Sequence, residues 1–214
     1  NSDREVDFML LIGICGASGS GKSTLSEELK TSIGSGCIII NHDSYYRDFP
    51  ELSFEQRARQ NYDEPGIFDH DLFLSDITTL LSGKPITRKD YDYTVHRRAD
   101  HDDEWINPAD VCIIEGIHVF HDPRLCELMF LKLYISVEAD ICLLRRIERD
   151  IKERERSIDS IAAQYLTTVK PMYIKYIRNY IELADVIVAN GGRNARIVDI
   201  LTGYVRDALN PVHE

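Results

Sequence analysis

The sequence has no apolar run long enough to cross a membrane. Its longest, residues 8–15, spans eight residues, whereas a membrane-spanning helix needs about 20. Positive charge is also scarce, because 25 Lys+Arg stand against 36 Asp+Glu and leave a formal charge of −11. A protein that binds nucleic acid or an anionic membrane needs a broad basic surface. We therefore expect no nucleic acid and no membrane among its partners, although a small anion could still bind in a local cationic pocket.

Paired cysteines and metal motifs are missing as well. The five cysteines are odd in number and show no Cys-x-x-Cys spacing, which predicts buried thiols in a reducing, cytoplasmic setting. The polar, acidic segment 1–7 does not resemble a signal peptide. No His-Glu-x-x-His spacing occurs, so we expect surface or structural roles for the following histidines: His42, His70, His101, His118 and His121.

Short apolar runs alternate with helical patterns, which indicates an α/β fold with a parallel sheet. The length favours a single domain over residues 1–214. Runs rich in Val, Ile, Leu and Cys predict five strands, at 8–15, 37–41, 111–115, 131–137 and 185–189. Helical spacing predicts helices at 22–33, 71–81, 140–152, 158–181 and 195–209.

Residues 44–109 interrupt this alternation. They contain the 71–81 helix, strand-like spacing at 84–93, a polar turn and a short segment at 104–107, which predicts an insert with a small antiparallel hairpin. Ligands of open α/β sheets bind at the carboxyl ends of the strands. Because the insert leaves the second strand at that edge, we expect it to cover a ligand.

Residues 16–23 match the phosphate-binding pattern G-x-x-x-x-G-K-[ST] in full. Glycines let the backbone turn its N–H groups towards phosphate oxygens, and the following helix adds its positive dipole end. The pattern assigns Lys22 to the β- and γ-phosphates and the Ser23 hydroxyl to Mg²⁺. The predicted nucleotide-binding residues are Gly16, Ala17, Ser18, Gly19, Ser20, Gly21, Lys22, Ser23 and Thr24.

Two carboxylates follow predicted strands that should lie near this loop. Asp43 comes after the strand at 37–41, and Glu115 closes the strand at 111–115. A carboxylate in such a position often only ends the strand and meets water. Phosphoryl transfer, however, needs Mg²⁺ and a group that accepts the proton of the attacking hydroxyl. We expect Asp43 to be that base, close to the metal, and Glu115 to serve the metal shell, directly or through water.

Residues 145–156 carry six cations interleaved with four acids. One interpretation is a solvated helix whose charges pair with one another. The other is a mobile lid, at about 145–160, whose arginines bind phosphate oxygens as the site closes. Arg146 and Arg149 share a helix face, and Arg154 lies where the helix could break. The local excess of cations in an acidic chain favours the lid.

The insert concentrates polar-tipped aromatic residues around one acid, Asp63. They are Tyr45, Tyr46, Tyr62, Tyr91, Tyr93 and His96. Tyrosines on strands commonly pack within the hairpin. These could equally enclose a flat ring, with His96 and a tyrosine hydroxyl at its edge, while Asp63 accepts two hydroxyls of a sugar diol. From spacing alone, both interpretations stay open.

Several segments occur in a particular order along the chain. They are Gly-Ala-Ser-Gly-Ser-Gly-Lys-Ser-Thr at 16–24, Asp-Ser-Tyr-Tyr-Arg at 43–47, Asn-Tyr-Asp-Glu-Pro at 61–65, Tyr-Asp-Tyr at 91–93 with His96, Glu-Gly-Ile at 115–117, Arg-Arg-Ile-Glu-Arg-Asp at 145–150, Gln-Tyr at 164–165 and Lys-Pro-Met at 170–172. Together they resemble the uridine kinase (uridine–cytidine kinase) family of P-loop kinases over about residues 10–205. Two positions depart from the family: Val95 stands where Thr is usual, and Tyr93 where many members have Phe.

The resemblance implies a P-loop NTPase-type sheet and ATP-dependent, Mg²⁺-assisted phosphorylation of the 5′-hydroxyl of uridine and cytidine, in pyrimidine salvage. It implies a homotetramer. It also implies that Asp63 and Arg146 hold the ribose. The implied phosphate contacts are Lys22, Arg149 and Arg154, and the implied metal residues are Ser23, Glu115 and Asp43. The other implied nucleoside contacts are Tyr46, Tyr62, Tyr91, Tyr93, His96, Arg156 and Gln164.

Three alternatives stay open on the sequence. A kinase similar to phosphoribulokinase or pantothenate kinase would share the loop, although the Tyr-Asp-Tyr…His segment favours a nucleoside. A GTPase would use Asp-x-x-Gly, which occurs at 63–66, but no apolar strand precedes it and no Asn-Lys-x-Asp occurs to recognise guanine. A non-catalytic nucleotide-binding module would not need Asp43.

Overall fold

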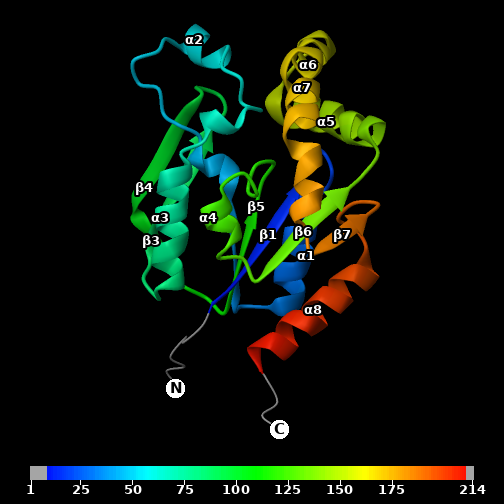
Figure 1. Ribbon diagram of the computed structural model, residues 1–214. Coiled ribbons are helices and arrows are strands. Elements are labelled where there is room, and N and C mark those ends of the chain that lie inside the picture. Colours follow the sequence, from blue (N-terminus) through cyan, green and yellow to red (C-terminus); the bar gives the residue numbers. More distant parts are fainter. Residues whose placement is uncertain (1–8, 211–214) are drawn as a thin grey trace.

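A parallel sheet of five strands, in the order β2-β5-β1-β6-β7, forms the centre of the protein (Figure 1). The computed structural model describes residues 9–210, so segment 1–7 and the first residue of the strand predicted at 8–15 lie outside the described residues. The strands are β1 (Leu10–Gly16), β2 (Cys37–Asn41), β5 (Val111–Glu115), β6 (Leu131–Ser136) and β7 (Val186–Ala189). The predicted α/β class and its five-stranded parallel sheet are confirmed.

Strand register brings the predicted site residues to one edge. Glu115, at the end of β5, is paired in register with Ile14 of β1 on one side and with Asn41 of β2 on the other. The loop that follows β1 and the turn that follows β2 therefore leave the sheet on either side of Glu115. In Figure 1 this edge points upward, towards α2 (Phe54–Ala58) and the group formed by α5 (Ala139–Arg154), α6 (Ile158–Gln164) and α7 (Lys170–Lys175).

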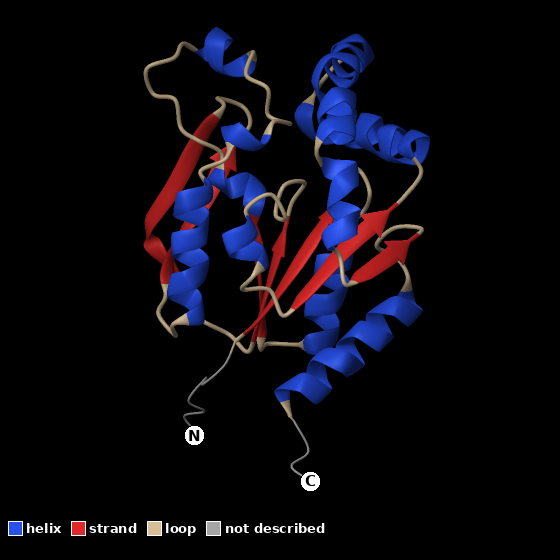
Figure 2. Ribbon diagram, viewed as in Figure 1, coloured by secondary structure: helices blue, strands red, loops and turns tan. Residues whose placement is uncertain are grey.

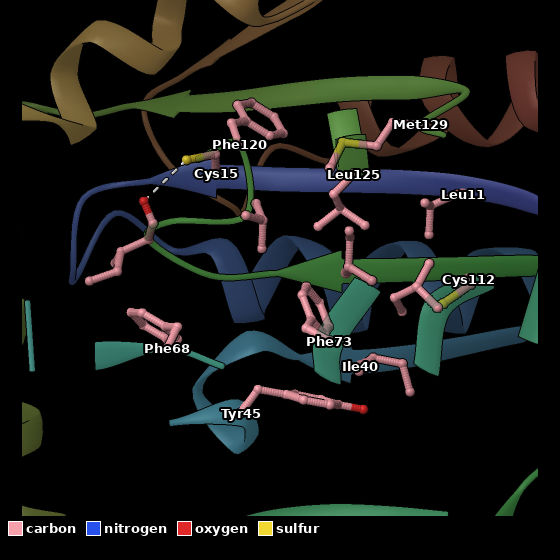
Figure 3. Close-up of a cluster of buried hydrophobic side chains, with 14 of the residues drawn as sticks. Leu11, Cys15, Ile40, Tyr45, Phe68, Phe73, Cys112, Phe120, Leu125 and Met129 are labelled. Atoms are coloured by element: carbon pink, nitrogen blue, oxygen red, sulfur yellow. Dashed lines mark hydrogen bonds between the residues drawn. The ribbon is translucent and has the colours of Figure 1, made fainter. Parts of the chain in front are cut away.

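Helices cover both faces of the sheet (Figure 2). Because side chains alternate between the two faces of a strand, β1 contributes to two cores. On one face, α1 (Lys22–Ile33) and α8 (Ala195–Leu209) pack Leu25 and Leu201 around Ile12. On the other, α3 (His70–Leu81) and α4 (Pro123–Cys126) pack Phe73 and Leu125 near Leu11 (Figure 3).

Local signals explain where the helices begin and end. The side chain of Asp69 accepts the N–H of Leu72 at the start of α3, as N-cap residues do. The start of α1 follows Gly21 and its end precedes Gly34, both at φ 101°, which glycine adopts readily. The helices predicted at 22–33, 71–81, 140–152 and 195–209 are confirmed as α1, α3, α5 (Ala139–Arg154) and α8.

The segment between β2 and β5 contains the predicted hairpin, built from β3 (Ile86–Asp92) and β4 (Arg97–Ile106). Two short 3₁₀ segments, η1 (His42–Tyr45) and η2 (Pro65–Ile67), lie before α3. The prediction of a polar turn up to residue 103 was wrong, because β4 begins at Arg97. Ion pairs across the strands replace apolar alternation there, with Arg88 2.9 Å from Glu104.

The long helix predicted at 158–181 was wrong as one element. The chain forms α6 (Ile158–Gln164), a π-helical segment η3 (Tyr165–Val169), α7 (Lys170–Lys175) and a 3₁₀ segment η4 (Ile177–Leu183). Pro171 lies in the first turn of α7 and has no N–H to continue the α-helical ladder from α6, which explains the interruption. No helix within residues 9–210 is both long and apolar enough to cross a membrane.

Candidate active site

The phosphate-binding loop, residues 16–23, joins β1 to α1 and lies beneath α5. Gly19 has φ +84°, and a Cβ at this position would overlap the carbonyl oxygen of Cys142 on α5. Gly21 has φ +101° and approaches the backbone of Gly192 in the same way. Glycine is therefore required at both positions, for conformation and for close approach. Since α1 begins at Lys22, its unpaired N–H groups and positive dipole end point at the loop.

Two side chains of the loop have polar groups that suit a bound anion. The Lys22 ammonium donates to the carbonyl of Ala17 at 3.0 Å, so the side chain folds back over the loop. The Ser20 hydroxyl is buried and finds no hydrogen-bond partner among residues 9–210. A buried polar group without a partner destabilises a protein unless a ligand supplies the bond. The loop therefore fits a phosphate chain in charge and in hydrogen bonding.

The two predicted carboxylates lie beside this loop. The Ser23 hydroxyl donates to Glu115 Oε1 at 2.8 Å, and burial raises the pKa of Glu115 although the charge of Lys22 opposes this. Asp43 lies in η1, where its N–H donates to the side chain of Asn41 at 2.8 Å. Asp43, Glu115 and the loop line one cleft of about 540 Å³.

The oxygen donors of this cleft suit Mg²⁺. That ion usually keeps several waters and takes one or two protein carboxylates together with substrate phosphates. Within residues 9–210 no group of three or more His, Cys, Asp or Glu side chains is arranged to hold a metal by itself. Ser23, Glu115 and Asp43 therefore fit a metal that is shared with a nucleotide better than a metal cage.

Tyr93 links the hairpin to this cleft. Its hydroxyl donates to Asp43 Oδ2 at 3.1 Å, and the guanidinium carbon of Arg154 lies 4.3 Å from the centre of its ring. Burial and the neighbouring Asp43 raise the pKa of Tyr93, so the hydroxyl remains a proton donor. Tyr93 of the insert thus contacts both the predicted base, Asp43, and Arg154 at the end of α5.

The buried face of helix α5, which lies against the site, carries charged residues. Its buried residues are Cys142, Arg146 and Asp150, one per turn. Asp150 is fully buried and lies 2.8 Å from Arg149, 3.4 Å from Arg156 and 3.6 Å from both Arg146 and Arg154. Burial alone would raise the pKa of Asp150, but the charges of Arg149, Arg146 and Arg154 outweigh it and lower the pKa.

The outer and inner faces of this charged helix differ. On the outer face, exposed Lys152 and Glu148 form a pair of 2.6 Å. On the inner face, the arginines gather around Asp150 next to the loop. Sequence reasoning missed Asp150, which it treated as one of the interleaved acids. The available signal was its spacing of four residues from both Arg146 and Arg154, which places all three on one helix face.

Asp63 lies in a second, smaller cavity of about 30 Å³, lined also by Arg146, Ser18 and Ile117. Asp63 Oδ1 is 3.9 Å from Arg146 Nη1, and Thr168 of η3 donates to Asp63 Oδ2 at 3.0 Å. Burial raises the pKa of Asp63, while the charge of Arg146 opposes it. Arg146 also donates to Ser18 Oγ at 3.0 Å, which connects this cavity to the phosphate-binding loop.

Gln164 and Arg156 lie beside Arg146. Arg146 Nη2 donates to Gln164 Oε1 at 3.0 Å, and Arg156 donates to the same oxygen. Glu155, at φ 53°, ends α5 and turns the chain, so the break predicted near Arg154 is confirmed. The structure thus links Asp63, Arg146, Gln164 and Arg156, the residues that the resemblance assigns to the nucleoside.

The aromatic residues of the insert divide into two groups. Tyr46 is buried in the core, 4.5 Å from the ring of Phe68, and donates to the carbonyl of Tyr62. Tyr62 stacks with His96 at 5.2 Å between ring centres, and Tyr91 donates to the Tyr62 hydroxyl at 2.9 Å.

Two of these rings reach a cleft on the hairpin side. His96 holds a left-handed backbone, and its buried Nδ1 finds no partner within the described chain, so it can bind a ligand. Tyr91 and Tyr93 line the cleft, which measures about 560 Å³, together with Arg154. Packing accounts for Tyr45 and Tyr46, whereas the Tyr93 hydroxyl bonds to Asp43 and Nδ1 of His96 is buried without a partner among residues 9–210.

A phosphate-binding loop on the central strand, flanked by strand-end carboxylates and faced by an arginine-bearing helix, defines a P-loop kinase. Comparison with known proteins agrees. The model of the phosphoribulokinase / uridine kinase family matches residues 11–196. A uridine kinase of Limosilactobacillus reuteri is 43% identical over 94% of this chain and 92% of its own, and one of Clostridium perfringens is 40% identical over 94% and 96%. The solved phosphoribulokinase of Rhodobacter spheroides has a TM-score of 0.59 at 13% identity, covering 86% of this chain and 70% of its own.

The chain therefore belongs to the phosphoribulokinase / uridine kinase family, and the resemblance predicted from its motifs is confirmed. It is a kinase, and membership of a kinase family implies ATP as the phosphoryl donor. The structural likeness to phosphoribulokinase supports the fold alone.

Proposed function

We propose that this protein transfers the γ-phosphoryl group of ATP to the 5′-hydroxyl of uridine and cytidine, giving UMP and CMP for pyrimidine salvage. The observation that supports it most is that Asp43 lines the same cleft as the phosphate-binding loop, with Arg149 and Arg154. An alcohol in this cleft would have a base on one side and a cation-bound phosphate on the other. The similarity to uridine kinases over 94% of the chain supports a nucleoside as that alcohol.

In this mechanism Asp43 accepts the proton of the attacking hydroxyl. Lys22, Arg149 and Arg154 bind phosphate oxygens and stabilise the charge that develops in the transition state. Mg²⁺, held by Ser23, Glu115 and Asp43, would supply further neutralisation of that charge. Because Arg149 and Arg154 rest near Asp150 in this structure, we propose that they exchange that carboxylate for phosphate when the lid closes.

We assign the acceptor site to residues around the second cavity and on the hairpin. Asp63 and Arg146 would hold the two ribose hydroxyls. The side chains proposed to enclose and recognise the pyrimidine are Tyr46, Tyr62, Tyr91, Tyr93, His96, Arg156 and Gln164. Of these, Tyr46 lies behind Tyr62 and would act by supporting it. Family resemblance also supports a homotetramer, and the five unpaired cysteines support the cytoplasm as the site of action.

A coupled assay of ADP release tests the proposal. It compares uridine, cytidine, adenosine, pantothenate and ribulose 5-phosphate as acceptors with Mg-ATP. We expect turnover with the two pyrimidine nucleosides and little with the rest. Turnover with pantothenate or ribulose 5-phosphate, and none with uridine or cytidine, would refute it. Exposed Asp102 on β4 provides the control, since Asp102→Asn should leave every rate unchanged.

A further inference from the structure

Behind the proposed ribose site, three side chains form a hydrogen-bonded chain that phosphoryl transfer does not use. His118, which is 1% exposed, has Nε2 2.8 Å from the backbone carbonyl oxygen of Asp63. Its other nitrogen, Nδ1, lies 3.0 Å from the hydroxyl of Tyr180. The same hydroxyl lies 3.0 Å from Nδ1 of His121, at the surface. A continuous path therefore runs from exposed His121 to the backbone of Asp63.

The partners determine where each proton lies. A carbonyl oxygen only accepts, so Nε2 of His118 carries the proton and donates to Asp63. Burial lowers the pKa of His118 to about 3, so the ring is neutral near pH 7 and its Nδ1 accepts from Tyr180. A hydroxyl has one proton, which leaves the Tyr180 oxygen to accept from Nδ1–H of His121. All three bonds thus point in one direction, towards Asp63.

Among the residues that the structure describes, Asp63 has hydrogen-bond partners for all but one of its polar atoms. Its N–H donates to the side chain of Asn61 at 3.1 Å, and its carbonyl accepts from His118. Its Oδ2 accepts from Thr168 at 3.0 Å. Within residues 9–210 only Oδ1 has no hydrogen-bond partner, and it lies 3.9 Å from Arg146 in the cavity that these two residues line. A residue held at its N–H, its carbonyl and Oδ2 presents Oδ1 in one direction.

We propose that His118, oriented by Tyr180 and His121, is a positioning residue that fixes Asp63 so that its remaining oxygen meets the ribose hydroxyls of the nucleoside. This inference rests on the proposed function. Asp63 lies outside any strand or α-helix, just before η2, where no regular hydrogen-bond ladder holds the backbone. Precise placement of a binding carboxylate on such a segment needs support from behind. His118 supplies it from the loop after β5.

The test compares His118→Leu, His118→Gln and Tyr180→Phe with the unaltered protein. Gln can donate through its amide to the Asp63 carbonyl, whereas Leu cannot. Loss of one oriented bond should raise the KM for uridine about tenfold in His118→Leu and about threefold in Tyr180→Phe. The KM for ATP should stay within about twofold, and His118→Gln should recover most of the loss. Tyr176→Phe is the matched control, because its ring lies edge-on to His118 at 6.0 Å without bonding to it.

A second substrate separates positioning from damage to the fold. With 2′,3′-dideoxyuridine, which lacks the hydroxyls assigned to Asp63, the penalty of His118→Leu and Tyr180→Phe should disappear. Three results would overturn the inference. The variants could raise the KM equally for both nucleosides, they could raise the KM for ATP in parallel, or both could leave the KM for uridine unchanged. If His118→Leu does not fold, Tyr180→Phe, which removes a single oxygen, decides alone. Failure of the unaltered protein to use uridine would instead refute the proposed function.

Discussion

The hydroxyl of Tyr93 donates a 3.1 Å hydrogen bond to the carboxylate of Asp43. A general base must accept a hydrogen bond from the alcohol that it activates. The hydroxyl of Tyr93 therefore occupies, in the free protein, one of the acceptor positions that the proposed mechanism gives to the 5′-hydroxyl of the nucleoside. The guanidinium of Arg154 lies over the ring of Tyr93, so this contact is connected to the end of α5.

Tyr93→Phe should remove this competitor while keeping the ring on which Arg154 stacks. Because the nucleoside would no longer displace a hydrogen bond, we expect the KM for uridine to fall about two- to fivefold. Steady-state kinetics with uridine at saturating Mg-ATP measure the change. A large fall in kcat would contradict this view, since it would mean that the Tyr93 hydroxyl takes part in the chemical step.

Asp43→Asn removes the proposed base and keeps its shape. We expect kcat to fall by about 10² to 10⁴, the usual size of a general-base contribution, with ATP binding retained. Single-turnover rates and a nucleotide titration measure the two quantities separately. Turnover close to that of the unaltered protein would show that another group accepts the proton.

Asp63→Asn removes the charge of the proposed ribose-binding carboxylate but keeps its size. The expected result is a rise of at least about tenfold in the KM for uridine, because a hydrogen bond to a charged group is among the stronger ones. The KM for ATP should not change, and this difference is the diagnostic measurement. An equal rise in the KM for uridine and for ATP would show that Asp63 supports the fold and does not bind the acceptor.

Asp150→Asn leaves the arginines of α5 without their shared counter-charge. Removing one partner from a buried ion-pair network typically costs about 3 kcal/mol, so urea unfolding should show a clear loss of stability. We also expect kcat to fall, since Arg149 and Arg154 lose their fixed starting position. Glu148→Gln on the outer face of the same helix is the control and should change neither quantity. Unaltered stability in Asp150→Asn would refute the organising role of this carboxylate.

The buried imidazole of His118 predicts a pH-dependent stability. Its pKa of about 3 in the folded protein lies below the usual 6.5, so below pH 6.5 the unfolded chain binds a proton that the folded chain does not. The free energy of unfolding should therefore fall as the pH falls from 6.5 towards 3, by about 1.4 kcal/mol per pH unit from this group. In His118→Gln that contribution should be absent from urea titrations at pH 6 and pH 4.5. Identical slopes for both proteins would contradict it.

The sequence predicted those parts of the site that adjacent residues specify. The loop at 16–23, Asp43 and Glu115 follow strands directly, so a linear pattern fixes both their chemistry and their edge of the sheet. The support of Asp63 was not predictable in this way. His118 and Thr168 lie 55 and 105 residues from Asp63 in the sequence, and only tertiary packing brings them there.

Charged residues made two further features, strand β4 and the buried Asp150, difficult to predict from the sequence. Strand β4 has no apolar alternation, since it pairs with β3 through the backbone and carries exposed ion pairs such as Arg88–Glu104, so its pattern resembles a turn. The same holds for Asp150, whose side chain is fully buried although Glu148, Arg149, Lys152 and Glu153 around it in the sequence are charged. Sequence patterns of polarity report exposure only where polar groups are not partnered inside the protein.

The π-helical segment η3 accommodates a residue that an α-helix of the same path would not contain. Loss of one codon between 165 and 169 would restore regular α-helical winding, and the chain downstream of η3 would keep its register because the extra residue is accommodated locally. Thr168, which lies within η3, would lose its contact with Asp63, while Tyr180 stayed beside His118 and the loop between β1 and α1 stayed as it is. A local change of helical winding, without substitution of any proposed binding residue, would thus loosen the carboxylate of Asp63 on an unchanged phosphate-transfer frame.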